Sequence, residues 1–343
     1  MSVNNIFIKI ILEMGVVSGL TTPFDHSMTT KLFKLIHVSF GICFVTYTLV
    51  QMKCDVINSL ESWPIWSNIV SAIMFLPKLN ENKGIYRKFS TTILVIRRKM
   101  KRGKDYFKIF VFFISTIVWS WYISSSFVYI YVHKINFFMI LTIAFWFIII
   151  LRLCILILIF SEISSIICGT YINVNNSMKE VFVRKFCFVT IFDKRIRKMR
   201  RDIMRLHQLI DYVNRIFGQV NLLLFIETFH HILLWFCYFI LLNTNFSIQI
   251  FVLCIILTMF SVIVILSCDR VEKKAEELIK TCIYIQASTG DENALALANL
   301  VKELRPKFSA AGFFDINQRI LPSFFSNLST YLIIILQFKL SSL

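Results

Sequence analysis

The stretch FFMILTIAFWFIIILRLCILILIF, residues Phe137–Phe160, decides the fold class. It carries one charged residue, Arg152, and is otherwise almost entirely apolar. A helix that crosses a bilayer needs about 20 mostly apolar residues, and in lipid only a helix or a closed barrel satisfies its own backbone groups. The stretch therefore predicts a transmembrane α-helix.

Six further stretches have the same character, and the composition agrees with them. Hydrophobic residues make up 57% of the 343 residues, against the roughly 45–50% that is usual in soluble domains, and the mean hydropathy is +0.70. We therefore predict an all-α membrane protein with seven transmembrane helices, multi-pass in the plasma membrane. The other spans are Leu32–Met52, Trp63–Leu79, Phe107–Val132, Gln219–Leu242, Phe246–Cys268 and Ile320–Leu340.

The basic residues set the predicted orientation. The loops after the second and fourth spans carry eleven Lys and Arg each, which is 22 of the chain's 37, when Lys78 and Lys108 at the edges of the flanking spans are counted with the first of these loops. The loops after the first and third spans carry only Lys53 and Lys134. Because Lys and Arg concentrate in cytosolic loops, we predict the N-terminus inside and, after seven crossings, the C-terminus outside.

The long cytosolic linkers show helical patterns of their own. Val181–Phe217 and Arg270–Leu304 place apolar residues among charged ones at helical spacing, the second around a break at Thr289-Gly290. We therefore predict a helical cytosolic layer beneath the bundle. The predicted divisions are a cytosolic N-terminal segment (1–31), a six-span bundle with long helical cytosolic loops (32–268), a cytosolic helical segment (269–319), and the seventh span with a short extracellular tail (320–343).

A stripe of mostly polar residues follows one side of the seventh span. Its members fall within about 60° of one another at 100° per residue. Polar side chains at membrane depth face protein or water rather than lipid. Two arrangements fit this pattern: close packing against another helix, where small hydroxyl residues are common, or the lining of a pore. The stripe comprises Ser326, Thr330, Ile333 and Gln337.

The end of this span resembles a known motif. Residues 330–338, TYLIIILQF, match the closing motif of insect gustatory receptors, which is Thr-Tyr, five hydrophobic residues and Gln-Phe. Residues 310–315, AAGFFD, resemble the family's Gly-Phe-Phe approach to that span. The family consists of seven-span ligand-gated cation channels related to insect odorant receptors, and the span count, predicted orientation and long cytosolic loops are similar to it.

The resemblance implies a tetramer in which the seventh span of each subunit lines one central pore. Gln337 and Phe338 match the family's gate, with Ile333 and Thr330 below them on the pore wall. Four touching helices about 10 Å wide leave a central gap of about 4 Å, which a side chain such as Phe338 can close. Tyr331 lies about 100° round the helix from Thr330, toward its own subunit, so we interpret Tyr331 and Thr330 as residues that couple the pore helix to the bundle.

Ionisable residues inside the fifth span form a second candidate site. Glu227 and His231 are four residues apart and share a helix face, with His230 beside them. Residues of this kind at membrane depth are functional candidates by default, here in ligand binding or gating, but the spacing favours a structural Glu–His pair. A metal site needs more ligands at fitting geometry, so we predict no metal.

Aromatic residues at middle or outer depth are the remaining candidates for ligand binding. They are Trp119 and Tyr122 in the third span, Trp146 in the fourth and Trp235 in the fifth. Members of the resembling family bind small ligands among these spans, and aromatic walls with a few polar groups suit that task. Ordinary bundle packing or anchoring at the membrane interface is the alternative.

Several other functions fit the sequence less well. The net charge of +17 is concentrated in two loops, which favours membrane topology and lipid contact over nucleic-acid binding. Asp269-Arg270-Val271 resembles the signature of G-protein-coupled receptors but follows the sixth span, and no internal repeat supports a secondary transporter. We expect no enzyme activity and no cofactor. The expected partners are a small-molecule tastant, membrane lipids, and further copies of this chain or sister subunits. By the resemblance, Leu332 stands where sugar receptors usually have Glu, so bitter-type compounds are the favoured ligands.

Overall fold

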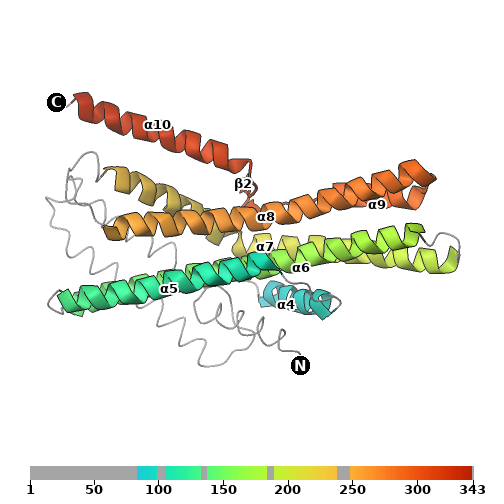
Figure 1. Ribbon diagram of the computed structural model, residues 1–343, viewed down its shortest axis with the longest axis horizontal. Coiled ribbons are helices and arrows are strands. Elements are labelled where there is room, and N and C mark those ends of the chain that lie inside the picture. The colour runs from blue at the N-terminus through green and yellow to red at the C-terminus, as the bar shows by residue number, and fades with distance from the viewer. Residues whose placement is uncertain (1–82, 99–104, 133–136, 184–188, 238–247, 342–343) are drawn as a thin grey trace.

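The described part of the protein is almost entirely helical (Figure 1). The computed structural model describes residues 83–98, 105–132, 137–183, 189–237 and 248–341. The elements are α4 (Lys83–Arg98), α5 (Tyr106–Val132), α6 (Phe137–Val183), α7 (Val189–Cys237), α8 (Ile248–Thr289), α9 (Glu292–Glu303), β1 (Ser309–Ala310), β2 (Phe314–Asp315) and α10 (Ile320–Ser341). The predicted segment 1–31 and the spans Leu32–Met52 and Trp63–Leu79 lie outside the described residues.

Five of these helices, α5, α6, α7, α8 and α10, are long and apolar enough to cross a membrane. They correspond to the third to seventh predicted spans, and the protein is thus a helical membrane protein. The last span agrees within one residue, since Ile320–Leu340 was expected and α10 covers Ile320–Ser341. Apolar composition predicts such helices well because lipid leaves the backbone no partner outside the helix.

The helix that contains the fourth predicted span is longer than the span itself. The span was placed over Phe137–Phe160, and α6 continues without a break to Val183. Hydropathy marks where apolar residues give way to polar ones, and the polar residues that follow Phe160 remain compatible with a helix. Of the helical segment expected over Val181–Phe217, the described residues belong to two helices: Val181–Val183 to α6 and Val189–Phe217 to α7.

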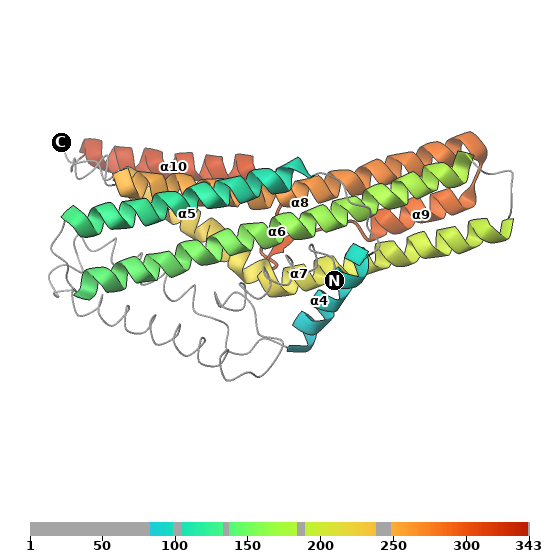
Figure 2. The ribbon, with the colours of Figure 1, turned by 60° about the horizontal axis from the view of Figure 1, so that its bottom comes forward.

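The expected break at Thr289-Gly290 is confirmed. Gly290 has a φ of +67°, a left-handed conformation that glycine adopts without steric cost. Asp291 then caps α9, its side chain accepting a hydrogen bond from the Asn293 backbone N–H at 3.0 Å. The turn folds α9 back against the charged end of α8, as Figures 1 and 2 both show.

The core lies along α6 and α8, which run side by side in both views with α5 next to them (Figures 1 and 2). Phe217 of α7 is fully buried where three helices meet. Its ring centroid is 6.0 Å from that of Phe89 on α4 and 5.7 Å from that of Phe160 on α6, both edge-to-face. Such aromatic pairs add about 0.5–1.5 kcal/mol beyond burial of their area, so they fix α4 and α7 against α6.

Candidate functional site

α10 contacts its own chain along one narrow face. Among its described side chains only Leu328 is buried, at 7% exposed. Phe324 and Leu321, one and two turns earlier, are half-buried. Towards the C-terminus the helix stands clear of α8 (Figure 1), so most of its surface is not covered by this chain.

The predicted pore residues lie on the opposite side of α10. Thr330, Ile333 and Gln337 are all exposed, and they lie about 140–200° round the helix from Leu328 at 100° per residue. The Thr330 hydroxyl donates to the Ser326 carbonyl at 3.0 Å, so it is satisfied within α10. Phe338, just past the stripe, is 70% exposed. The stripe therefore faces away from its own bundle.

Tyr331 lies on the side of α10 that faces the bundle. Its ring centroid is 5.7 Å from that of Phe229 on α7, and Phe229 also contacts Phe324 at 5.6 Å, both edge-to-face. The ring of Phe229 thus touches α10 at two positions that lie two turns apart. The sequence analysis missed Phe229, because nothing in an apolar span distinguishes an aromatic that touches α10 from one that faces lipid.

A small hairpin leads into α10. Strand β1 pairs with β2 in antiparallel register, Ser309 with Asp315 and Ala310 with Phe314. Between them Ala311 and Gly312 have φ values of 53° and 86°, and the Phe313 N–H donates to the Ala310 carbonyl at 3.0 Å. Positive φ at both central residues is the pattern of a type I′ turn. The segment 310–315, singled out by its resemblance to a family motif, is therefore this hairpin.

The hairpin is seated on α7. The Asn214 side chain donates to the Lys307 carbonyl at 2.8 Å and accepts from the Ser309 N–H at 2.9 Å. One turn later, a Cβ added to Gly218 would lie 3.0 Å from the Ala311 N. The backbone of the hairpin therefore rests on the bare backbone of α7.

These contacts form one continuous surface, which we call the α10-facing stripe of α7. Its members lie within about 60° of one another round the helix. Phe225 extends it between the hairpin and the span, with its ring 5.5 Å from that of Phe314. The α10-facing stripe comprises Asn214, Gly218, Phe225 and Phe229. The amide and glycine four residues apart in a mainly apolar helix were the signal that could have revealed it.

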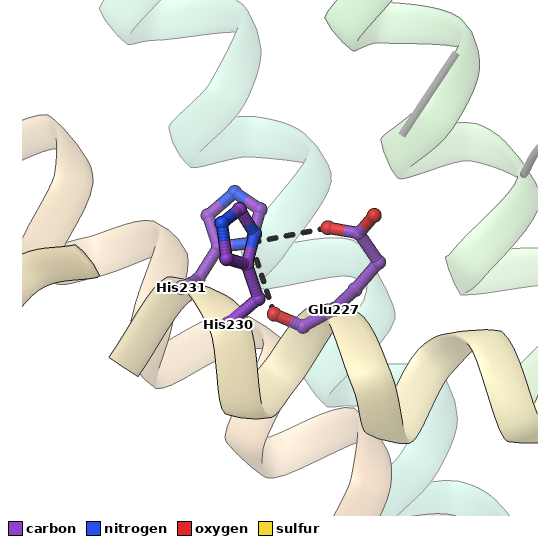
Figure 3. A group of neighbouring side chains, drawn as sticks. All are labelled: Glu227, His230 and His231. Carbon is purple, nitrogen blue, oxygen red and sulfur yellow. Dashed lines mark hydrogen bonds and ion pairs between the residues drawn. The ribbon is translucent and has the colours of Figure 1, made fainter. Parts of the chain in front are cut away.

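Glu227, His230 and His231 lie together on the other side of α7 (Figure 3). Glu227 and His231 are both buried. The His231 Nδ1 is 3.2 Å from the Glu227 Oε2 and 3.0 Å from the Glu227 carbonyl oxygen. The half-buried His230 ring stacks edge-on against His231, with centroids 5.6 Å apart. The predicted Glu–His pair is thus present in the structure.

The aromatic candidates divide between two places. Trp119 and Tyr122 on α5 share Phe147 of α6 as a neighbour, at centroid distances of 4.9 and 6.2 Å. The Tyr122 hydroxyl donates to the Ile143 carbonyl at 2.6 Å. Trp235 on α7 instead packs against Phe236 and against Phe251 of α8. Trp146 belongs to α6, and its side chain lies outside the described residues.

Arg270 of α8 contacts the start of α5 at the charged side of the bundle. Its Nη2 donates to Asp105 Oδ1 at 3.0 Å, and its guanidinium lies 4.3 Å from the Phe107 ring. Burial raises the pKa of Asp105, but hydrogen bonds from Ser165 and Arg270 and the Arg270 charge outweigh it and hold the pKa below its usual value. Arg270 thus holds α8 against the start of α5 and has the role of a packing residue.

The arrangement of the helices matches solved structures of one receptor class. The insect olfactory receptor OR5 from Machilis hrabei aligns with a TM-score of 0.69 at 12% identity, over 96% of this chain and 97% of that one. The same receptor in complex with eugenol aligns with a TM-score of 0.58 at 10% identity, over 96% and 98%. The fold is therefore that of an insect olfactory receptor. No curated protein matches the chain by sequence.

Comparison of the sequence with known protein families identifies the family. A family description of the 7tm chemosensory receptor matches residues 85–342, and the chain belongs to that family. The prediction of an insect chemoreceptor from residues 330–338 is thereby confirmed, and the protein is a membrane receptor rather than an enzyme.

Proposed function

We propose that this protein is a gustatory-type receptor that opens a non-selective cation pore when a small-molecule tastant binds. The observation that carries the proposal is the two-sided character of α10: Leu328 packs on its own chain, while Thr330, Ile333 and Gln337 face outward on the opposite side. A polar amide is costly against lipid. Other copies of α10 around a water-filled axis would satisfy it.

The proposed assembly is a tetramer of this chain, alone or with sister subunits, in the plasma membrane. Each subunit has seven spans with its N-terminus inside and its C-terminus outside, and the α10 helices line the axis. The charged ends of α6, α7 and α8, together with α9, form the cytosolic layer. The exposed apolar residues of α10, such as Phe325 and Leu336, pack against neighbouring subunits or lipid.

Cysteine cross-linking tests the proposed axis without knowledge of the ligand. In Gln337→Cys, copies of α10 that meet at an axis bring thiols close enough for disulfides, which need Cβ atoms about 3.5–4.5 Å apart. We expect mild oxidation of membranes to give covalent dimers on non-reducing gels. The native cysteines that the structure describes should contribute little background cross-linking, because all of them are buried: Cys154, Cys168, Cys254, Cys268 and Cys282.

Leu328→Cys is the matched control, since it places a thiol on the side of α10 that packs on its own chain. It should give no dimers under the same oxidation. Equal dimer formation by Leu328→Cys and Gln337→Cys, or none from Gln337→Cys, Ile333→Cys and Thr330→Cys together, would show that these helices do not meet at an axis.

The proposed topology has its own test. Epitope tags fused to either end should differ in accessibility, because 22 of the 37 basic residues fall in, or at the edges of, the two loops expected to be cytosolic. On intact cells we expect an antibody to label only the C-terminal tag. Permeabilised cells, in which both tags must be labelled, are the control. Labelling of the N-terminal tag on intact cells overturns the predicted orientation, with the N-terminus inside.

The proposed ligand is a small, largely apolar molecule of the bitter type. Two features support a non-sugar ligand: Leu332 follows Thr330-Tyr331 where sugar receptors usually have Glu, and the candidate walls are aromatic. The OR5 receptor, which shares this fold, was solved in complex with eugenol, itself a small molecule. The candidate contacts fall in two groups: Trp119 and Tyr122 on α5 with Trp146 on α6, and Trp235 with Glu227 and His231 on α7.

A further inference from the structure

Three potential metal ligands leave α7 within a little more than one turn. Glu227, His230 and His231 stand at positions i, i+3 and i+4 of the helix, and one ligand atom from each lies within 4.8 Å of the other two. In Figure 3 the two imidazole rings overlap in the view, and the Glu227 carboxylate lies beside them, joined to one ring by a dashed line. Glu-x-x-His at i and i+3 is the spacing by which helices in bundles present metal ligands.

The Glu227 carboxylate supplies a second, independent observation that points to a cation site. Its residue is only 2% exposed, and its Oε1 accepts no hydrogen bond from the residues that the structure describes. Burial of a carboxylate costs free energy when one of its oxygens has no hydrogen-bond donor or cation as a partner. The i+4 contact with His231 Nδ1 reaches Oε2 only. A bound cation at this point would satisfy the remaining oxygen.

The turn that carries these ligands is fixed by α8. The Thr228 hydroxyl lies 2.8 Å from the Ser261 hydroxyl, and Cys254 Sγ donates to the His231 carbonyl at 3.1 Å. The backbone that positions the ligands is therefore held on both sides of His230. Half-burial of His230 leaves the site open on one side, where an ion and its remaining water ligand can enter.

We propose that Glu227, His230 and His231 bind a divalent transition-metal ion of the zinc class. Two imidazoles and a carboxylate suit zinc, cobalt or copper, whereas magnesium and calcium prefer oxygen alone. Zinc–ligand bonds of about 2.0–2.2 Å put tetrahedral ligand atoms about 3.3 Å apart, so side-chain rotation must bring them together by about 1.5 Å or less. Three protein ligands leave the fourth position to water.

The site also has a place in gating, and this consequence alone rests on the proposed function. It lies on the side of α7 opposite Phe229, which touches α10 at Phe324 and Tyr331. An ion that clamps residues 227, 230 and 231 stiffens the turn that carries Phe229. Metal binding would thereby change how readily α10 moves.

Cobalt titration tests the site itself, whether or not the protein is a channel. Full-length receptor in detergent, stripped with chelator, is titrated with Co²⁺ while its visible d–d absorption is followed. We expect one ion per chain with the intense bands of tetrahedral coordination, and displacement by Zn²⁺, which binds such sites more tightly than Co²⁺. His230→Asn, His231→Asn and Glu227→Gln should each weaken binding by about tenfold or more.

His207→Asn is the matched control. His207 forms a pair with Asp211 at the same i, i+4 spacing on the same helix, with Nε2 to Oδ2 at 3.7 Å. Its removal should leave the cobalt spectrum and affinity unchanged. A wild-type protein without displaceable tetrahedral bands overturns the proposal, as does wild-type affinity in all three ligand variants or equal weakening in His207→Asn. Substitution of the buried Glu227 or His231 could prevent folding. His230 is half-buried, so His230→Asn can still be compared with His207→Asn in that case.

Discussion

Phe338→Ala is expected to give the receptor a leak current in the absence of ligand. The side chain is 70% exposed at the end of α10, and in the proposed tetramer four copies surround the axis beside Gln337. Apolar constrictions close pores by excluding water. Truncation of the ring widens the constriction and lowers that barrier. Whole-cell recording beside surface biotinylation measures the current per receptor at the cell surface.

Two companion variants define the result. Gln337→Ala should change ion selectivity or conductance without a leak, because it removes the polar ring but not the apolar plug. Phe325→Ala removes the same ring from an exposed position near the other end of α10, and it should leave resting current unchanged. If Phe338→Ala shows no leak and Gln337→Ala keeps normal selectivity, both at normal surface levels, the pore runs elsewhere.

Gly218→Val is expected to unseat the hairpin that leads into α10 and so to lower both stability and surface expression. A Cβ at this position would lie 3.0 Å from the Ala311 N and 3.2 Å from the Ser309 carbonyl oxygen. These are backbone atoms, which cannot rotate away as a side chain can. Overpacking of this kind costs about 1–3 kcal/mol. The apparent Tm of detergent-solubilised receptor should fall by several degrees.

A graded series separates steric from other causes. Gly218→Ala, which adds the Cβ alone, should give a smaller fall in Tm than Gly218→Val. Gln219→Val places the same valine one position further on, on the exposed side of α7, and should leave Tm close to that of the wild type. A wild-type Tm in Gly218→Val would mean that the hairpin does not rest on α7.

Much of the helical architecture followed from local chemistry. The limits of α10 were predicted within one residue, and the turn at Gly290 was placed correctly. Both signals are local: a long apolar run forms a helix in the membrane, and glycine readily adopts the left-handed conformation that ends a helix. The ends of the inner helices were not predictable in this way. α6 extends to Val183, since helix formation continues where hydropathy falls.

The candidate site likewise has a part that local pattern predicts and a part that it does not. The outward stripe of α10 depends on helical periodicity alone, so its members could be named from the sequence. The surface against which α10 rests could not. Asn214 bonds to residues 93 and 95 positions away, and Phe229 meets Tyr331 only because the hairpin turns α10 back over α7.

By itself, then, the sequence determined the helical membrane class, the family and the residues on each side of α10, all of which depend on composition, period and a short motif. The tertiary structure alone decided that Gly218 and Asn214 seat the hairpin and that Arg270 pairs with Asp105 rather than with its neighbour Asp269. Contacts between distant segments depend on how the helices cross, and that geometry is set by packing over the whole bundle rather than by any local pattern.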